Sequence, residues 1–398
     1  MKAIVVGAGF AGLAAADALV RAGVEVEVFE ARDRVGGRVW SVPFAGAAVE
    51  RGAEFILPHD RTLMAVADRL GLALVRKGTL YGNREPRGGR AVSGAEVLAA
   101  VARLGSERGN ETLADALRSS GLEPGVAEAI RSRFEVSCAY PADDLDASVL
   151  TEGAGAFGDF DTWTVAGGND RIAGELARGL GDAVHLSSPV SSVAWSEASV
   201  TLVADGRDAA ADAAVIAVPA SVIGSIEFEP VLPAETQAAV QGVRYGQAAK
   251  LFVALRTLAP PSQTLSIPDR FWCYTQLGAD GAPLPFLGAF AGSPGALAGL
   301  DVESGPERWL DAVARLRPDL DLDVDRALLS TWADDPWVCG AYSAGSATSP
   351  LDAEALRRPV GPLWFAGEHT AGGWHGLMEG ALRSGERAAQ ELLHSSSR

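Results

Sequence analysis

Residues 4–15 read IVVGAGFAGLAA, in which a short apolar strand runs through closely spaced glycines into an alanine-rich helix. Gly7, Gly9 and Gly12 form the pattern G-x-G-x-x-G. The first glycine permits a tight turn, the second lets the backbone approach a pyrophosphate, and the third lets helix and strand pack closely. The helix N-terminus adds free N–H groups and a dipole that favours negative charge. This stretch therefore predicts a dinucleotide-binding unit.

The flanking residues complete this unit. A strand over 2–6, a helix over 10–22 and an alternating strand over 24–29 make a βαβ unit of the expected size, about 30 residues. Glu30 ends the second strand, where a carboxylate can accept hydrogen bonds from ribose hydroxyls. A glycine-rich helix start used only for packing would leave Glu30 unexplained.

The segment ARDRVGGRVW at residues 31–40 continues the predicted site. Gly36 and Gly37 allow a turn, and Arg38 can reach a phosphate through its planar guanidinium fork. Arg32 is expected over the adenine end of the dinucleotide, with a solvated surface arginine as the alternative.

A second glycine-rich motif lies at the other end of the chain. Residues 364–389 read WFAGEHTAGGWHGLMEGALRSGERAA, a pattern of strand, loop and helix. Either motif alone is ambiguous, whereas the two together predict a long cofactor held by both ends of the chain. This favours a flavin over a nicotinamide.

Composition narrows the class of protein. The 398 residues are 48% hydrophobic and 21% charged, as expected of a globular enzyme with two domains. The net charge of −17 argues against nucleic acid and anionic membranes as partners. Cys138, Cys273 and Cys339 form no C-x-x-C pair and no cluster with histidine, so we expect neither a metal site nor a disulfide. A reducing cytoplasm is the default location, and no apolar run predicts a membrane span.

Helix and strand patterns alternate in blocks along the rest of the chain. Helical patterns dominate residues 60–160 and are interrupted by a glycine- and arginine-rich loop at 82–90. Strand patterns return at 183–203, 214–219 and 247–255. The remaining patterns are helices at 306–317, 351–357 and 376–393 and a strand at 363–367.

These segments together resemble the flavin-containing amine oxidase family, which includes monoamine and polyamine oxidases. The N-terminal similarity lies in GAGFAGLAAADAL (7–19), Glu30, RVGGRV (34–39) and ERGAEFI (50–56). The middle similarity lies in VAGGNDRIAGELARGL (165–180), SPVSSVAW (188–195) and AVIAVPASV (214–222). The C-terminal similarity lies in DPWVCGAYS (335–343) and FAGEHTAGGWHGLMEGALRSGERAA (365–389). The resemblance covers the chain apart from the helical region around 80–160.

The resemblance implies FAD bound in an extended form. Val190 would contact the adenine through its backbone, and Glu368 would meet the ribityl and pyrophosphate region. Met378 would present its N–H to the flavin pyrimidine edge, at a helix start whose dipole stabilises negative charge. The complete set implied for the cofactor is Gly7, Gly9, Ala11, Gly12, Glu30, Arg32, Gly37, Arg38, Ala53, Glu54, Val190, Gly367, Glu368, Leu377 and Met378.

Lys250 is the first residue expected to act in catalysis. Only three of the 34 lysine and arginine residues are lysines, and Lys250 lies in the strand-like run AAKLFVAL. A lysine in an apolar strand is costly unless it has a partner or a function. The resemblance implies that Lys250 is bridged by water to flavin N5. The alternative is an edge-strand lysine whose ammonium reaches solvent.

Two aromatic residues are expected beside the substrate. Tyr342 corresponds to one of the two aromatic walls that flank the substrate nitrogen in the resembling family. Leu377 stands where the family usually has the second wall, a tyrosine, and Trp374 could partly replace it or belong to the core. A half-apolar cage predicts a less polar or differently shaped substrate.

Three departures from the family pattern affect the expected chemistry. Monoamine oxidases attach their flavin through a cysteine immediately before the tyrosine, whereas this chain has Ala341, with Cys339 two positions away. Non-covalent FAD is therefore expected. Leu57 stands where polyamine oxidases often carry Glu or His, and Phe55 stands where amino-acid oxidases place a carboxylate-binding arginine.

The sequence thus predicts an α/β fold, with a Rossmann-type FAD-binding domain and a mixed α+β substrate-binding domain inserted in two segments. The expected FAD-binding domain comprises 1–62, 165–235 and 350–398, and the substrate domain 63–164 and 236–349.

The expected reaction transfers a hydride from the α-carbon of a small-molecule amine to flavin N5. Imine hydrolysis would follow, and O2 would reoxidise the flavin to give hydrogen peroxide. The alternatives are a same-fold enzyme acting on a non-amine (a desaturase or natural-product tailoring oxidase), an amino-acid oxidase, or a flavin-bearing binding protein. A homodimer is left open.

Overall fold

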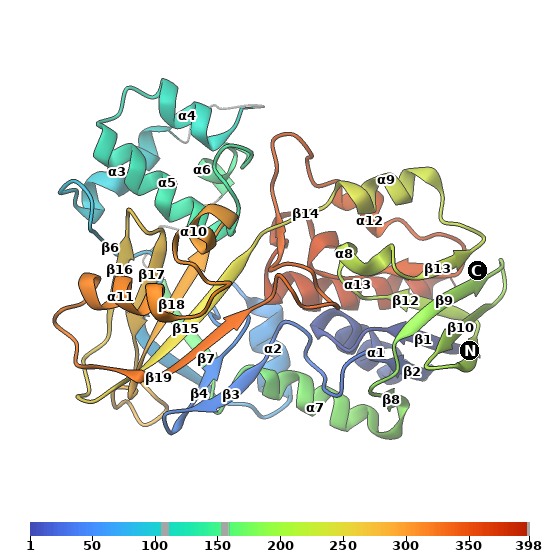
Figure 1. The fold of residues 1–398 in the computed structure, drawn as a ribbon. Coiled ribbons are helices and arrows are strands. Elements are labelled where there is room, and N and C mark those ends of the chain that lie inside the picture. Colours follow the sequence, from blue (N-terminus) through green and yellow to red (C-terminus); the bar gives the residue numbers. More distant parts are fainter. Residues whose placement is uncertain (105–110, 153–157, 159, 396–398) are drawn as a thin grey trace.

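The computed structural model describes residues 1–104, 111–152, 158 and 160–395. Two lobes lie side by side, and both chain termini belong to the right-hand lobe of Figure 1. The right-hand lobe is built mainly from the beginning, the middle and the end of the chain, coloured blue, green and red.

A parallel five-stranded sheet forms the centre of the right-hand lobe. Side chains of the strand Lys2–Val6 alternate between the two faces of this sheet. Ala3 and Val5 pack against the helices on one face, while Ile4 and Val6 belong to a second hydrophobic cluster on the other face. Both faces are covered at the centre of the sheet, where three strands with the sequences KAIVV, AAVI and LWF are mainly apolar, as is usual in a parallel sheet. The strand order is β21 (Leu363–Phe365), β12 (Ala213–Ile216), β1 (Lys2–Val6), β2 (Glu25–Phe29) and β8 (Val184–His185).

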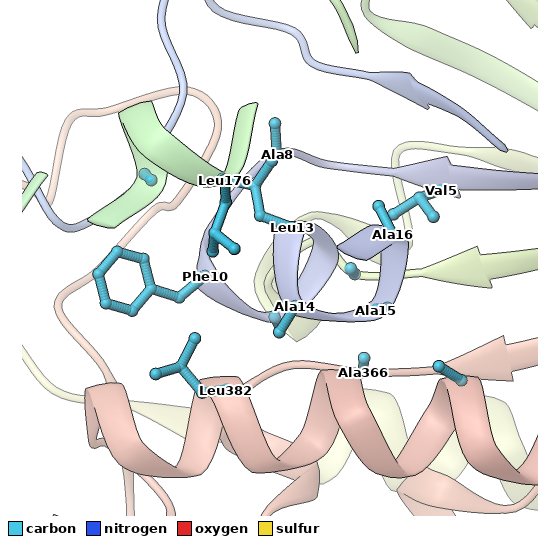
Figure 2. Close-up of a cluster of buried hydrophobic side chains, with 14 of the residues drawn as sticks. Val5, Ala8, Phe10, Leu13, Ala14, Ala15, Ala16, Leu176, Ala366 and Leu382 are labelled. Atoms are coloured by element: carbon cyan, nitrogen blue, oxygen red, sulfur yellow. The ribbon is translucent and has the colours of Figure 1, made fainter. Parts of the chain in front are cut away.

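The two ends of the chain pack directly against each other on one face of this sheet. Helix α1 (Phe10–Arg21) contacts α13 (Met378–Ser395) and α7 (Asp170–Leu180), and Figure 2 shows Leu382 of α13 beneath Phe10 and Ala14. The approach is close enough to require glycine, since a Cβ at Gly385 would lie 2.1 Å from the Ala11 carbonyl oxygen. The two glycine-rich motifs therefore belong to one structural unit.

A four-stranded sheet covers the other face of the parallel sheet. Its order is β11 (Arg207–Ala211), β10 (Val200–Ala204), β9 (Val190–Trp195) and β13 (Glu227–Glu229). Short helices complete this lobe: η2 (Gly181–Ala183), α8 (Ala220–Ile223), α9 (Ala234–Gly242), α12 (Ala353–Arg357), η3 (Glu368–Thr370) and η4 (Gly372–Trp374).

The left-hand lobe is built on a mixed six-stranded sheet. Only the β6–β16 pair is parallel. One face packs on α11 (Glu307–Leu316) through Trp309 and Val313. The strand order is β19 (Leu322–Thr331), β15 (Ala248–Leu255), β18 (Phe286–Gly292), β17 (Phe271–Thr275), β16 (Ser262–Ser266) and β6 (Glu85–Arg87).

Further elements flank this sheet and join the lobes. Four helices, α3 (Gly94–Leu104), α4 (Leu113–Ser119), α5 (Pro124–Cys138) and α6 (Val149–Glu152), gather at the upper left of Figure 1. Three two-stranded ribbons are β3 (Ser41–Phe44) with β4 (Ala47–Glu50), β5 (Leu74–Leu80) with β7 (Asp161–Val165), and β14 (Arg244–Tyr245) with β20 (Ser343–Ala344). The last helices are α2 (Arg61–Arg69) and α10 (Pro294–Gly299).

The predicted fold class is confirmed, because a Rossmann-type parallel sheet is combined with a second, mixed sheet. The loop expected at 82–90 was wrong in part, since Glu85–Arg87 forms β6 through parallel pairing with β16. Strands β16, β17 and β18 were not predicted. The division into domains at the stated boundaries stays a prediction. Among the described helices, none combines the length and hydropathy needed to cross a membrane.

Candidate active site

A cavity of about 770 Å³ lies between the lobes and is lined by residues of both. All the predicted cofactor residues except Gly12 line it, and so do Lys250, Tyr342 and Trp374. Gly12 lies behind the cavity wall, where a Cβ would meet the Gly7 carbonyl oxygen at 1.9 Å. The motif glycine predicted to serve helix–strand packing therefore occupies a position that suits that role.

The glycine turn shapes the first end of the cavity. Gly7 has a φ of +100°, which strongly favours glycine, and a Cβ at Gly9 would meet no protein atom within 4 Å. Gly9 is the N-cap residue of α1, and no side chain caps the helix there. The first N–H groups of α1 thus lack the usual capping side chain at the place where a pyrophosphate is expected.

Glu30 closes this end of the cavity at the tip of β2. Its carboxylate accepts hydrogen bonds from the backbone N–H of Ala8 at 2.7 Å and of Arg32 at 3.0 Å. Burial raises the pKa of Glu30 despite these bonds. Each carboxylate oxygen has a second lone pair, so Glu30 can still accept bonds from a diol in the cavity.

Arg32 and Arg38 are both held by carboxylates. Arg32 pairs with Asp335 at 2.5 Å and is only 14% exposed in its side chain, so the alternative of a solvated surface arginine was wrong. Arg38 Nη1 donates to Glu368 Oε1 at 2.8 Å and to the Ala341 carbonyl at 2.9 Å. Both arginines line the cavity.

Glu368 is buried and accepts hydrogen bonds from several parts of the chain. It accepts hydrogen bonds from the backbone N–H of Ser343 at 3.1 Å and of Gly376 at 2.7 Å, besides that from Arg38. Burial alone would raise the pKa of Glu368, but the Arg38 guanidinium and these donors outweigh it and hold the pKa at about 2. The carboxylate therefore fixes the loop before α13 and the segment around Tyr342.

Lys250 lies on an inner strand, so the edge-strand alternative was wrong. Strand β15 has neighbours on both sides, and Lys250 is 5% exposed. Ala249 and Leu251 face the helix α11, which sends Lys250 to the opposite face. Its ammonium donates to the Glu50 carbonyl at 2.9 Å and to Glu54 Oε2 at 2.6 Å.

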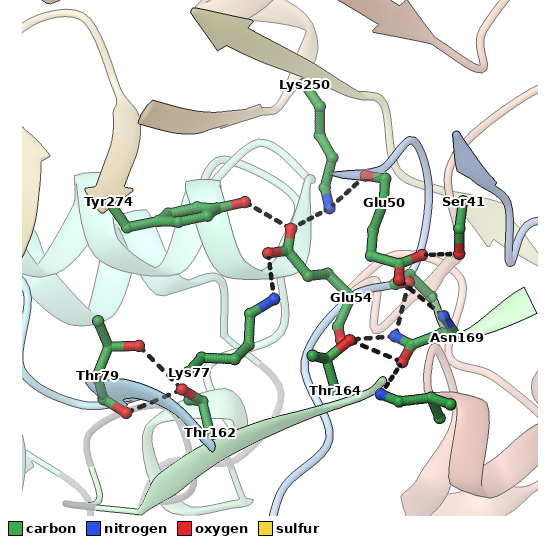
Figure 3. Close-up of polar contacts among 12 residues, drawn as sticks. Ser41, Glu50, Glu54, Lys77, Thr79, Thr162, Thr164, Asn169, Lys250 and Tyr274 are labelled. Carbon is green, nitrogen blue, oxygen red and sulfur yellow. Dashed lines mark hydrogen bonds and ion pairs between the residues drawn. The ribbon is translucent and has the colours of Figure 1, made fainter. Parts of the chain in front are cut away.

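Glu54 joins two of the three lysines of the chain (Figure 3). Lys77 contacts Glu54 Oε1 at 3.0 Å, and the Tyr274 hydroxyl donates to Oε2 at 2.6 Å. Burial would raise the pKa of Glu54, but the charges of Lys250 and Lys77 hold it at about 2. Lys77 and Tyr274 were missed from the sequence, although the rarity of lysine was a usable signal for Lys77.

Tyr342 and Trp374 both lie at the cavity. The Tyr342 hydroxyl donates to the Ser137 carbonyl at 2.8 Å, and burial raises the pKa of Tyr342 well above its usual range. Trp374 is partly exposed, with its ring 5.8 Å from that of His59, so the core alternative for Trp374 was wrong. Leu377 is 43% exposed.

An aromatic chamber continues the cavity beyond Lys250 and was not predicted. Phe290 lies between Lys250 and Trp272 in the register of β15, β18 and β17. The rings of Phe55, Tyr81 and Trp272 lie within 6 Å of one another. Trp272 comes from β17, whereas Phe55 and Tyr81 come from loop and turn positions, so the sequence separation of the three rings conceals the grouping. Arg84 also lines this chamber.

A glycine turn of the kind that binds nucleotides and an aromatic chamber line one cavity, which is the arrangement expected of an enzyme that holds a cofactor and a substrate side by side. The chain belongs to the family of flavin-containing amine oxidoreductases, whose model matches residues 10–119 and 144–393. It is therefore an oxidoreductase that uses a flavin and acts on small-molecule amines, and the non-amine alternative is not favoured.

Individual relatives cover almost the whole chain. Putrescine oxidase of Kocuria rosea is 28% identical, over 99% of this chain and 95% of its own. A solved structure of putrescine oxidase bound to putrescine superposes with a TM-score of 0.85 at 25% identity, covering 99% of both chains. Cyclohexylamine oxidase from Brevibacterium oxydans IH-35A shares the fold, with a TM-score of 0.85 at 23% identity over 100% of this chain and 99% of its own.

Proposed function

We propose that the protein binds FAD non-covalently and oxidises the carbon next to the nitrogen of a small amine, with O2 as the electron acceptor. The observation that carries the proposal is the single cavity that runs from Gly9 to Lys250 and Tyr342. The flavin supplies the redox chemistry by accepting a hydride equivalent and passing it to O2 as hydrogen peroxide.

The residues around the glycine turn fit the nucleotide half of FAD. The open space at Gly9 leaves room for a pyrophosphate at the start of α1, and Glu30 has lone pairs for the ribose hydroxyls. Arg38 has five N–H donors, and its bonds to Glu368 and Ala341 come from a single nitrogen, Nη1. Backbone amides and a few arginines would thus bind phosphates in a chain of net charge −17.

Tyr342 and Trp374 would orient the amine. The bond from Tyr342 to the Ser137 carbonyl fixes its ring, and the high pKa keeps its hydroxyl neutral. Neither residue has to act as a base, because an unprotonated amine can lose its hydride equivalent without one. The imine product would then hydrolyse in water.

Lys250 would hold a water beside the redox centre. An ammonium has three N–H donors, of which Glu54 and the Glu50 carbonyl take two. The third N–H is available to a water in the cavity that Lys250 lines. Lys250 could thereby supply a proton as reduced cofactor reacts with O2.

Replacing Lys250 with methionine should leave the flavin bound and slow its reoxidation by roughly 100-fold, the typical contribution of a positioned proton donor. The reaction is followed by mixing anaerobically reduced enzyme with O2 in a stopped-flow instrument. Lys77→Met is the matched control, since Lys77 contacts the same carboxylate but does not line the cavity. Equal slowing in both variants, or none in Lys250→Met, would contradict the assigned role.

The flavin should leave the protein when the fold is destroyed. Ala341 lines the cavity where a covalent attachment would need a cysteine, while Cys339 is exposed and does not line it. Cys138 does line the cavity, but burial raises the pKa of its thiol to about 12 and leaves it unreactive. Acid precipitation should therefore put all the yellow colour into the supernatant, and colour in the washed pellet would refute non-covalent binding.

A further inference from the structure

Arg84 is a buried cation without an anionic partner among the described residues. Its side chain is 5% exposed, and no carboxylate of the described residues forms an ion pair with it. Its Nη1 donates a hydrogen bond to the Ser137 hydroxyl at 3.1 Å, and the buried Nε has no partner among the described residues. An unpaired buried charge is expensive, so a guanidinium in this position requires an explanation.

Arg84 lies in the aromatic chamber beside the expected substrate wall. Its guanidinium carbon is 3.6 Å from the centre of the Trp272 ring and 4.8 Å from that of Tyr81. Ser137, which accepts the bond from Arg84, also accepts the bond from the Tyr342 hydroxyl through its carbonyl. The ring stacking holds the planar fork in place, and the cation faces the same cavity as Tyr342.

The other charged groups at this end of the cavity are already neutralised or positive. Glu54 is shared by Lys77 and Lys250, so its carboxylate already pairs with two ammonium groups. A second ammonium on the substrate would meet Arg84 without an available carboxylate to offset it. A carboxylate would instead satisfy the free donors of Arg84 in a dry site, where charge-assisted bonds are strongest.

We propose that Arg84 recognises a carboxylate on the substrate, so that the preferred amine is a carboxylated monoamine and not a diamine or polyamine. The proposal rests on the proposed function and narrows its substrate class. In the register of β15, β18 and β17, Trp272 lies two strands from Lys250, about 10 Å. The carboxylate would therefore be separated from the reacting carbon by an apolar segment that fills the aromatic chamber.

The first test compares substrates that differ only at the far end. The first set contains three linear amines of similar length. At the end opposite the reacting amine, aminohexanoate carries a carboxylate, n-hexylamine a methyl group and the terminal diaminohexane an ammonium. Phenylalanine and phenethylamine form a second pair in which the carboxylate is attached directly to the reacting carbon. We expect aminohexanoate to have a higher kcat/KM than n-hexylamine, the diamine to have the lowest value, and phenylalanine to have no advantage over phenethylamine.

A second test removes the arginine. Arg84→Met should lower the ratio of kcat/KM for acid over amine by about 100-fold, and Arg84→Lys should recover part of it by restoring the charge without the fork. Arg317→Met is the matched control, because Arg317 is also a buried arginine but pairs with Asp319 and does not line the large cavity. Its ratio should equal that of the wild type.

The outcomes separate the two proposals. If none of these amines reduces the flavin anaerobically, the proposed function fails. If flavin is reduced, but n-hexylamine outperforms aminohexanoate, only the carboxylate proposal fails. An Arg84→Met protein that loses flavin and slows equally on all substrates would also overturn it, since Arg84 would then support the cofactor.

If Arg84→Met does not fold, inhibition of the wild type decides. Hexanoate and phenylacetate should compete with the amine and perturb the flavin absorbance, whereas hexanol and toluene should do so far more weakly. Equal inhibition by the acids and the uncharged compounds would contradict the proposal.

Discussion

Alanine at Gly9 is expected to abolish flavin binding and leave the fold intact, whereas alanine at Gly12 is expected to damage the fold itself. The Gly9 backbone, at φ −72° and ψ 178°, is allowed for alanine, and its Cβ would enter open space in the cavity. That space is where the pyrophosphate is expected. The Kd for FAD should rise at least about 100-fold, or about 2.7 kcal/mol.

The Gly12 Cβ would instead lie 1.9 Å from the Gly7 carbonyl oxygen, which is backbone and cannot move aside cheaply. We expect a loss of about 3 kcal/mol in the free energy of unfolding. Thermal unfolding of both apoproteins, with flavin titrated by fluorescence, separates the two effects. A Gly9→Ala protein that binds FAD normally would show that the pyrophosphate lies elsewhere.

Replacing Glu54 with leucine should cost about 3–5 kcal/mol in the free energy of unfolding, because it leaves two buried ammonium groups without their shared carboxylate. Burial lowers the pKa of Lys250 even in the presence of Glu54. Without Glu54, the folded pKa of Lys250 would fall further below the unfolded value of about 10.4. Urea unfolding at pH 7 measures the loss.

The pH dependence identifies the cause of this loss. A buried lysine with a lowered pKa destabilises the fold below its unfolded pKa, and the cost decreases as pH rises toward that value. The deficit of Glu54→Leu should therefore shrink between pH 7 and pH 10. Adding Lys77→Met should recover part of the stability at pH 7. A deficit that is unchanged by pH and by Lys77→Met would point to lost packing.

The residues that the sequence predicts for the cofactor, apart from Gly12, line one cavity. They could be chosen from local patterns, because a glycine turn between a strand and a helix has fixed backbone geometry wherever it occurs. Gly12 is an example. The sequence assigns it to helix–strand packing, and it is the one residue of the predicted cofactor set that does not line the cavity. The partners of the charged residues could not be predicted. Asp335, for example, is separated from Arg32 by 303 positions.

The substrate half depends on contacts between segments that are far apart in sequence. Trp272 lies beside Phe290 because β17 and β18 pair in the mixed sheet, while Phe55 and Tyr81 reach the same chamber from loop and turn positions outside that sheet. The sequence places Arg84 in a loop rich in glycine and arginine. The structure adds that its guanidinium lies over the ring of Trp272, which holds it at the cavity. Strand register is a tertiary property, and a shift of one residue in the pairing would turn each side chain of the strand to the opposite face of the sheet.

The sequence by itself determined the Rossmann-type unit, the flavin and the family, since the turn, the capping-free helix start and the terminal acidic residue are encoded within short segments. Only the tertiary structure decided the state of Lys250 and the polarity of the substrate chamber. Lys250 shares Glu54 with Lys77, and Arg84 has no such carboxylate among the described residues. The energy of a buried charge depends on what lies within a few ångströms, and those neighbours come from distant parts of the chain.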